Sequence, residues 1–202
     1  MRRIIGVTGG IASGKSNVCS IISNLGYPVI DCDKLSKELS VKGGLVYNAM
    51  VNALGDKYLL EDGNLDRKKI AKLIFNDAEA RALIDRATHP IIIDELKKRI
   101  NDIEDGLVFV EAPLLFEAKL NEICDKVICV FLNKKYQVER LMARDGIDED
   151  YALAKIHSQM DLYMKKELAD FVVNSKGTFD ETNAQVLGII EEIKGVSHYG
   201  SN

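Results

Sequence analysis

The sequence predicts an α/β fold in which a five-stranded parallel sheet is covered by helices on both faces. Five short apolar runs lack the polar alternation of a half-exposed sheet, and segments with helical spacing lie between them. Such alternation of buried strands with helices is typical of a three-layer parallel architecture. A length of 202 residues suits one domain, and we expect a helical insertion between the second and third strands.

The first predicted strand covers residues 3–9 and ends in a glycine-rich loop. From Lys15 onward, apolar residues recur at helical spacing as far as Leu25, and Gly26 is a suitable helix stop. A second short strand is predicted at 27–33, where an apolar run ends in aspartates. These segments predict a strand–loop–helix–strand unit at the start of the sheet.

The predicted insertion covers residues 34–105, which have helical character with breaks at 42–44 and 61–64. One amphipathic helix is expected through 92–103. We expect His89–Pro90 to interrupt the helix before it, because proline lacks an amide donor and restricts the preceding residue.

Three more apolar runs restore the strand pattern, at 106–113, 125–132 and 170–175. A terminal helix is predicted through 186–193, and the tail at 195–202 is expected to fray. The sheet core is therefore expected at about 1–33, 106–133 and 168–195 of one domain.

Composition excludes several functional classes. The formal net charge is −4, which favours neither nucleic acid nor an anionic membrane as a partner. The four cysteines form no C-x-x-C pair and have no histidine close in sequence, so we expect buried free thiols rather than a zinc site. No apolar run approaches the roughly 20 residues of a membrane span. These features predict a cytoplasmic protein.

The stretch "GVTGGIASGKS" at 6–16 contains the complete phosphate-binding pattern G-x-x-x-x-G-K-[ST]. Glycines allow the backbone N–H groups to curl around phosphate oxygens. Lys15 can reach the β- and γ-phosphates, and Ser16 offers a hydroxyl to Mg²⁺. The pattern follows a predicted strand and opens a predicted helix, so we expect a P-loop NTPase-type fold that binds a nucleoside triphosphate with Mg²⁺. The expected nucleotide-binding residues are Gly10, Ile11, Ala12, Ser13, Gly14, Lys15, Ser16 and Asn17.

The class of nucleotide-binding protein follows from which further motifs accompany the loop. A regulatory GTPase would carry D-x-x-G, yet no glycine has an aspartate three residues before it. Residues 133–136 begin like the guanine motif N-K-x-D but lack its aspartate. A mechanical ATPase would show an acidic pair at a strand end, whereas Glu111 stands alone. A small-molecule kinase fits the remaining evidence.

Asp31 and Asp33 lie where the second predicted strand leaves the sheet, at the edge where open α/β sheets bind ligands. A carboxylate there can orient the acceptor hydroxyl and take its proton. Asp33 can equally cap a helix that starts near Lys34. Asp31 can orient a water on Mg²⁺ or hold Lys15.

Arg140 and Arg144 lie four residues apart and so share one face of a helix. Together they can stabilise charge on a transferring phosphoryl group. The alternative is a surface helix on which they pair with Glu139 or Asp145. Arg140 is the stronger candidate for phosphate contact.

Several segments together resemble the dephospho-coenzyme A kinase family. They are "GVTGGIASGKS", "VIDCD", "HP" at 89–90, "EAPLLFE" at 111–117, "ERLMARD" at 139–145, "HSQM" at 157–160 and "ADFVVNSKG" at 169–177. The resemblance runs from residue 4 to about 177 at the family's spacing. It implies transfer of phosphate from ATP to 3′-dephospho-coenzyme A, and a P-loop kinase core with a helical acceptor-binding insertion (34–105) and a lid (134–167).

The resemblance also implies roles for individual residues. It makes Asp33 the catalytic base, beside Lys15 and Arg140, and assigns Arg144 and Gly177 to the ATP site. The acceptor-binding residues that it implies are Asp33, Arg67, His89, Pro113, Leu114 and Leu115. For His89 the alternative is a helix cap or a packed turn, and for residues 113–115 it is ordinary core packing.

The chain departs from the family's pattern at three places. Asn17 stands where threonine is frequent, and Asn174-Ser175 replaces an Asp-Asn pair beside the expected adenine site, which leaves the adenine contacts open. Lys166 replaces an arginine and cannot give the same planar grip.

Two further hypotheses stay open from the sequence: a kinase for another small hydroxylated or nucleotide acceptor, and a regulatory module that binds ATP with little turnover. The expected partners are ATP and dephospho-coenzyme A. The sequence does not indicate the oligomeric state.

Overall fold

The computed structural model describes residues 2–195, so most of the tail, at 196–202, lies outside the described residues. The chain divides into two compact units. Unit 1 comprises Met1–Val29 and Asp105–Asn202, and unit 2 comprises Ile30–Glu104. Because each unit has its own apolar cluster, we describe them separately.

One five-stranded sheet organises unit 1, although only Val29 of its strand β2 falls within that unit. Its strands are β1 (Arg3–Gly9), β2 (Val29–Asp31), β3 (Leu107–Glu111), β4 (Lys126–Phe131) and β5 (Phe171–Asn174), in the order β2-β3-β1-β4-β5. The central strand β1 pairs in parallel with β3 and β4, and Val7 lies opposite both Glu111 and Ile128. The predicted parallel α/β architecture is confirmed.

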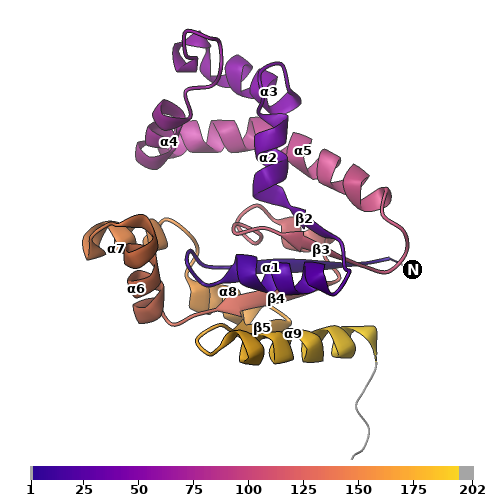
Figure 1. Ribbon diagram of the computed structural model, residues 1–202. Helices are drawn as coiled ribbons and strands as arrows, with labels where there is room; N and C mark the ends of the chain where they lie inside the picture. The colour runs from indigo at the N-terminus through magenta and orange to yellow at the C-terminus, as the bar shows by residue number, and fades with distance from the viewer. Residues whose placement is uncertain (1, 196–202) are drawn as a thin grey trace, which may run out of the picture. The chain divides into compact units, whose positions relative to one another are not determined.

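Helices α1 (Lys15–Asn24) and α9 (Phe179–Lys194) pack on one face of this sheet (Figure 1). Their apolar faces join the strand residues in one buried cluster, which includes Ile5, Val18 and Ile190. Helix α8 (Leu162–Leu168) packs against β4 and β1. The strands are buried on successive residues, which explains their continuous apolar sequences.

Two further helices of unit 1 pack against each other, α6 (Lys134–Asp145) and α7 (Glu149–His157) (Figure 1). Val138, Leu141 and Ala152 form their buried cluster, and the glycine-rich loop packs on it through Ile11 and Ala12. The short η2 (Leu120–Ile123) follows β3. The loop therefore rests on α6 as well as on the sheet.

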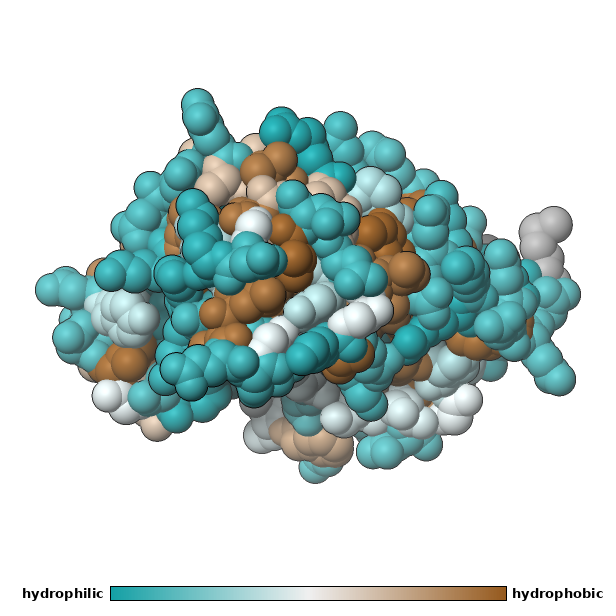
Figure 2. Space-filling model, turned by 90° about the horizontal axis from the view of Figure 1, so that it is seen from above, coloured by the Kyte–Doolittle hydropathy of each residue, from teal (hydrophilic) through white to brown (hydrophobic). Residues whose placement is uncertain are grey.

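Unit 2 is helical and contains α2 (Cys32–Leu39), α3 (Leu45–Leu54), η1 (Asp56–Tyr58), α4 (Arg67–Asn76) and α5 (Ala78–Asn101). Its cluster is built from Leu65, Ile70 and Ile84 with half-buried residues around them. Several large apolar side chains of this unit are exposed, Phe75 most of all, and Figure 2 shows apolar residues among hydrophilic ones on the face that it draws.

Two expectations about local structure are wrong. Helix α5 continues through Pro90 instead of breaking there, because its packing against α2, α3 and α4 outweighs one missing backbone hydrogen bond. Strand β2 is shorter than 27–33, because α2 already begins at Cys32.

Within the part of the chain that the structure describes, no helix combines the length and the apolar character needed to cross a membrane. Over the same residues, no three acidic, histidine or cysteine side chains gather as a metal-binding group. All four cysteines are free, and burial raises the pKa of the Cys129 thiol to about 12.

Candidate active site

The glycine-rich loop joins the end of β1 at Gly9 to the start of α1 at Lys15. Gly14 has a left-handed backbone with φ of 86°, which a side chain would strain. Ala12 also has a positive φ, 57°, and is one of two non-glycine residues with that conformation among residues 2–195. The loop is thus a tight backbone turn at a helix N-terminus, which is the arrangement that binds phosphate.

Lys15, the cation of this loop, pairs with the carboxylate of Glu111 at the end of β3. Both side chains are largely buried, with 12% and 10% of their surface exposed. The sheet order places β3 beside β1, so the two charges meet at the carboxyl edge of adjacent strands. The sequence analysis missed Glu111 as a partner, although an acidic residue at the end of an apolar strand was a usable signal.

Arg140 of α6 is tied to the segment that follows β5. Its Nη2 donates to the carbonyl oxygen of Ser175 at 2.8 Å. The Ser175 hydroxyl in turn donates to the carbonyl oxygen of Ser13 in the loop at 2.5 Å. One chain of hydrogen bonds therefore connects a candidate phosphate-binding arginine with the candidate phosphate-binding loop.

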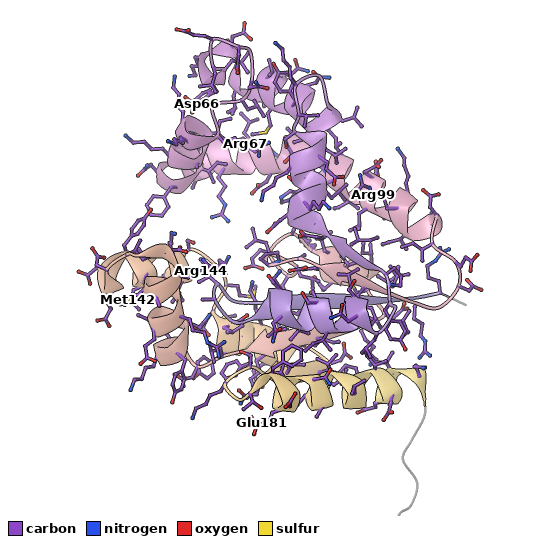
Figure 3. All side chains as sticks on the ribbon, in the orientation of Figure 1. Asp66, Arg67, Arg99, Met142, Arg144 and Glu181 are labelled. Atoms are coloured by element: carbon purple, nitrogen blue, oxygen red, sulfur yellow. The ribbon has the colours of Figure 1, made fainter. Side chains whose placement is uncertain are left out.

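Arg144 lies one turn further along α6 and forms an ion pair with Asp145 at 2.8 Å (Figure 3). Lys155 of α7 also reaches Asp145 at 2.8 Å. The hydrogen bond from Arg144, followed by that from Lys155, lowers the pKa of the Asp145 carboxyl to about 2. The surface pairing considered for Arg144 is present, whereas Arg140 does not make it.

Asp31 and Asp33 have different local roles in unit 2. Asp31 caps α2, because its side chain accepts from the Lys34 N–H at 2.9 Å. The alternative that Asp33 is this cap is therefore wrong. Asp33 lies in the first turn of α2 and is exposed at the helix N-terminus, where a carboxylate is stabilised by the helix dipole.

Two other candidates of unit 2 lie on different helices. Arg67 is the first residue of α4, directly after the cap Asp66, and it is exposed (Figure 3). It borders a cavity of about 280 Å³ lined mainly by apolar side chains, among them Met50 and Ile70. His89 lies within α5, one turn from Asp85, with 3.4 Å between its Nε2 and the carboxylate. His89 is thus a helical residue and not part of a turn.

A buried lysine of α8 holds the segment after β3 through a hydrogen bond and an ion pair. Lys165 of α8 has no exposed side-chain surface; it donates to the Pro113 carbonyl oxygen at 2.5 Å and pairs with Glu117 at 2.8 Å. Leu115 is fully buried, whereas 38% of Leu114 is exposed. Of the predicted acceptor-pocket residues 113–115, Leu115 therefore packs in the core of unit 1.

Gly177 precedes α9, and the capping box of that helix explains why it is glycine. A Cβ at this position would lie 2.0 Å from the Glu181 carboxylate, which accepts from the Thr178 N–H at 2.7 Å. If residue 177 carried a methyl group, the Glu181 side chain could not keep its hydrogen bond to the Thr178 N–H. Gly177 thus has a structural role independent of ATP.

Comparison with known proteins gives one consistent result. The family model described as Dephospho-CoA kinase matches residues 3–181. The Dephospho-CoA kinase of Carboxydothermus hydrogenoformans is 38% identical over 194 residues, which are 95% of this chain and 94% of that protein. That of Enterococcus faecalis is 40% identical over 194 residues, 95% of this chain and 98% of that protein.

Solved structures agree with the sequence relatives. The Dephospho-CoA kinase from Campylobacter jejuni has a TM-score of 0.71 and 30% identity, covering 98% of this chain and all, 100%, of that one. A Thermus thermophilus protein has a TM-score of 0.84 and 29% identity, over 97% and 98% of the two chains. A shikimate kinase from Acinetobacter baumannii, with 15% identity, a TM-score of 0.55 and coverage of 98% and 97%, shares the fold.

Proposed function

The chain belongs to the dephospho-CoA kinase family, ATP-dependent kinases of the last step of coenzyme A biosynthesis, and we propose that Lys15, Asp33 and Arg140 carry its phosphoryl transfer. The acceptor is the 3′-hydroxyl of dephospho-CoA. The observation that carries this proposal is the glycine-rich loop, with Lys15 held at the carboxyl edge of the sheet by Glu111.

In the proposed reaction, the loop at 10–17 binds the triphosphate of ATP through its backbone N–H groups and the N-terminus of α1. Lys15 exchanges its contact with Glu111 for the β- and γ-phosphates, and Arg140 neutralises charge that develops on the transferring group. Asp33 accepts the proton of the acceptor hydroxyl while the oxygen of that hydroxyl forms a bond to the γ-phosphorus. The bond between that phosphorus and the bridging oxygen breaks, and ADP leaves.

Mg²⁺ enters with ATP as part of the substrate. The Ser16 hydroxyl at the start of α1 and the Glu111 carboxylate would supply the hard oxygen ligands that this ion prefers, and few protein ligands would suffice because Mg²⁺ keeps several waters. When bound, the ion neutralises phosphate charge. The four free thiols support a reducing compartment, and we propose the cytoplasm.

We propose Arg67, His89, Pro113 and Leu114 as acceptor-binding residues, in addition to Asp33. Arg67 offers a charged fork for phosphate oxygens beside the apolar cavity. We propose 134–167 as the lid that excludes water from the γ-phosphate during transfer.

The test is ADP release from Mg-ATP with dephospho-CoA, beside AMP, CMP and shikimate as alternative acceptors. Wild type is compared with Asp33→Asn and with Asp94→Asn, which removes another exposed carboxylate, from α5 of the same unit. We expect turnover with dephospho-CoA alone, a loss of about 10²- to 10⁴-fold in Asp33→Asn, and no loss in Asp94→Asn.

Three outcomes contradict parts of the proposal. Turnover with another acceptor would retain the kinase and reject the acceptor. Full activity of Asp33→Asn would reject Asp33 as the base. Binding of ATP by folded wild type without acceptor-dependent turnover would favour a regulatory module.

A further inference from the structure

Two carbonyl oxygens of the glycine-rich loop accept hydrogen bonds from side chains outside the loop, one on α6 and one in the segment after β5. The Gln137 Nε2 atom of α6 donates to the Ile11 carbonyl oxygen at 2.8 Å. The Ser175 hydroxyl donates to the Ser13 carbonyl oxygen at 2.5 Å. Both side chains are buried, with 2% exposure for Gln137 and 7% for Ser175, which is unusual for polar residues unless they make specific hydrogen bonds.

The approach of Gln137 is close enough to restrict the sequence of the loop. A Cβ at Gly10 would lie 2.4 Å from the Gln137 Nε2 atom. The second glycine of the "GG" pair is therefore needed for contact with α6 rather than for an unusual φ angle. The contact thus depends on both partners: Gln137 supplies the donor, and Gly10 leaves the space for it.

The direction of these hydrogen bonds relates to phosphate binding. A loop that binds an anion must turn N–H groups toward it, and consecutive peptide units then turn carbonyl oxygens away. An unheld peptide can flip its carbonyl oxygen toward the phosphate, where the two negative partial charges repel. A donor that fixes the Ile11 carbonyl oxygen on the far side prevents this flip.

We infer that Gln137 is a positioning residue for ATP, which holds the Ile11 peptide in the orientation that binds phosphate. This inference rests on the proposed ATP site. Gln137 touches the loop and not the reacting atoms, so it acts on affinity for the triphosphate. Arg140 lies one turn away on the same helix and donates to the Ser175 carbonyl oxygen, and Ser175 in turn donates to Ser13 of the loop. Helix α6 therefore contacts the loop directly at Ile11 and through Ser175 at Ser13.

The experiment measures the Kd of Mg-ATP by calorimetry for wild type, Gln137→Met and Gln137→Glu at pH 6 and pH 8. Methionine keeps the length and removes the donor. Glutamate keeps the shape of glutamine, but its ionised carboxylate can only accept hydrogen bonds and therefore repels the Ile11 carbonyl oxygen. Once the glutamate carboxyl is protonated, it can donate to that oxygen. Glu139→Gln, an exposed neighbour on α6, is the control, and the melting temperature of each variant is recorded.

We expect Gln137→Met to weaken ATP binding about 10-fold and Gln137→Glu about 100-fold at pH 8, as for a misplaced binding group. Relative to wild type at the same pH, Gln137→Glu should recover part of its affinity at pH 6, where a protonated carboxyl can donate. Gln137→Met should show no such recovery, and Glu139→Gln should match wild type. The Kd of Mg-ATP reports on Gln137 even if wild type fails to phosphorylate dephospho-CoA.

Two results would overturn the inference. The first is an unchanged Kd in Gln137→Met and Gln137→Glu. The second is equal weakening in both variants at both pH values with a lower melting temperature, which would make Gln137 a packing residue. If Gln137→Glu does not fold, Ser175→Ala takes its place: retained ATP affinity in both Ser175→Ala and Gln137→Met would overturn the inference.

Discussion

The two units place their candidate residues in different surroundings. In unit 1, the Lys15 cation has a buried carboxylate partner, and two loop carbonyl oxygens have buried donors. In unit 2, Asp33 and Arg67 are exposed at the first turns of α2 and α4. The buried contacts give unit 1 a preorganised site, whereas helix termini present the candidate side chains of unit 2 to solvent.

Under our proposal that unit 1 binds ATP and unit 2 contributes to acceptor binding, this difference suits the two substrates. A triphosphate is compact and needs a fixed set of donors, whose reorganisation would cost binding energy. A large acceptor makes contacts over a wide surface, to which single exposed groups can contribute. We therefore expect substitutions of the buried groups of unit 1 to affect stability and catalysis together, and substitutions at the exposed candidates to affect catalysis or acceptor binding alone.

The largest effect is expected at Lys15. Lys15→Met should lower kcat/KM by roughly 10³-fold, because it removes the cation that stabilises the negative charge of the transferring phosphate. It also leaves the buried Glu111 carboxylate without its cation, which should cost about 3 kcal/mol of unfolding free energy. Urea denaturation measures the stability, and ADP release measures the activity.

The double variant Lys15→Met/Glu111→Gln separates these two effects. It should recover most of the lost unfolding free energy, because the unpaired carboxylate is gone, and none of the activity. If the double variant is as unstable as Lys15→Met, the ion pair does not stabilise unit 1 in the way we infer.

Arg140→Ala should lower kcat by about 10²-fold with little change in unfolding free energy, because Arg140 is an exposed residue of α6. Arg140→Lys should not restore the activity, since an ammonium cannot reproduce the planar fork. Arg144→Ala should have a smaller effect, as Arg144 already pairs with Asp145. A larger loss of kcat in Arg144→Ala than in Arg140→Ala would reverse our assignment of the two arginines.

A substitution at Arg67 tests whether this residue of unit 2 contributes to binding of the acceptor and not of ATP. Arg67→Ala should raise the KM for dephospho-CoA about 10-fold, which corresponds to one charge-assisted hydrogen bond, and leave the KM for ATP unchanged. Lys68→Ala, its exposed neighbour on α4, is the matched control. An equal rise in both KM values would show that Arg67 does not act on the acceptor in particular.

The smallest effect is expected at Asp145, where exposure limits the value of its ion pairs. Because its pKa is lowered from 3.8 to about 2, its contribution to stability is complete above pH 3.8 and is lost as the pH falls through about 2. A nuclear magnetic resonance titration of the Asp145 carboxyl should give a midpoint near 2 in wild type, and a higher midpoint in Lys155→Ala. A midpoint at 3.8 would mean that neither ion pair persists in solution.

Much of unit 1 could be predicted from local patterns. The apolar runs predicted all five strands, and the complete phosphate-binding motif located the turn between β1 and α1. The prediction failed at Pro90, where helix packing outweighs a local preference, and the alternative that Asp33 caps a helix is wrong, because the cap is Asp31, two residues earlier. Local rules fail there because several arrangements of similar energy compete and packing selects one.

The sequence by itself determined the fold class, the phosphate-binding loop and the family. Only the tertiary structure decided which groups hold that loop: Glu111 for Lys15, Gln137 for Ile11 and Ser175 for Ser13. These partners lie 96, 126 and 162 residues apart in sequence. No local periodicity can specify such pairs, because they meet only when the strand order β3-β1-β4-β5 brings the carboxyl ends of distant strands to one edge.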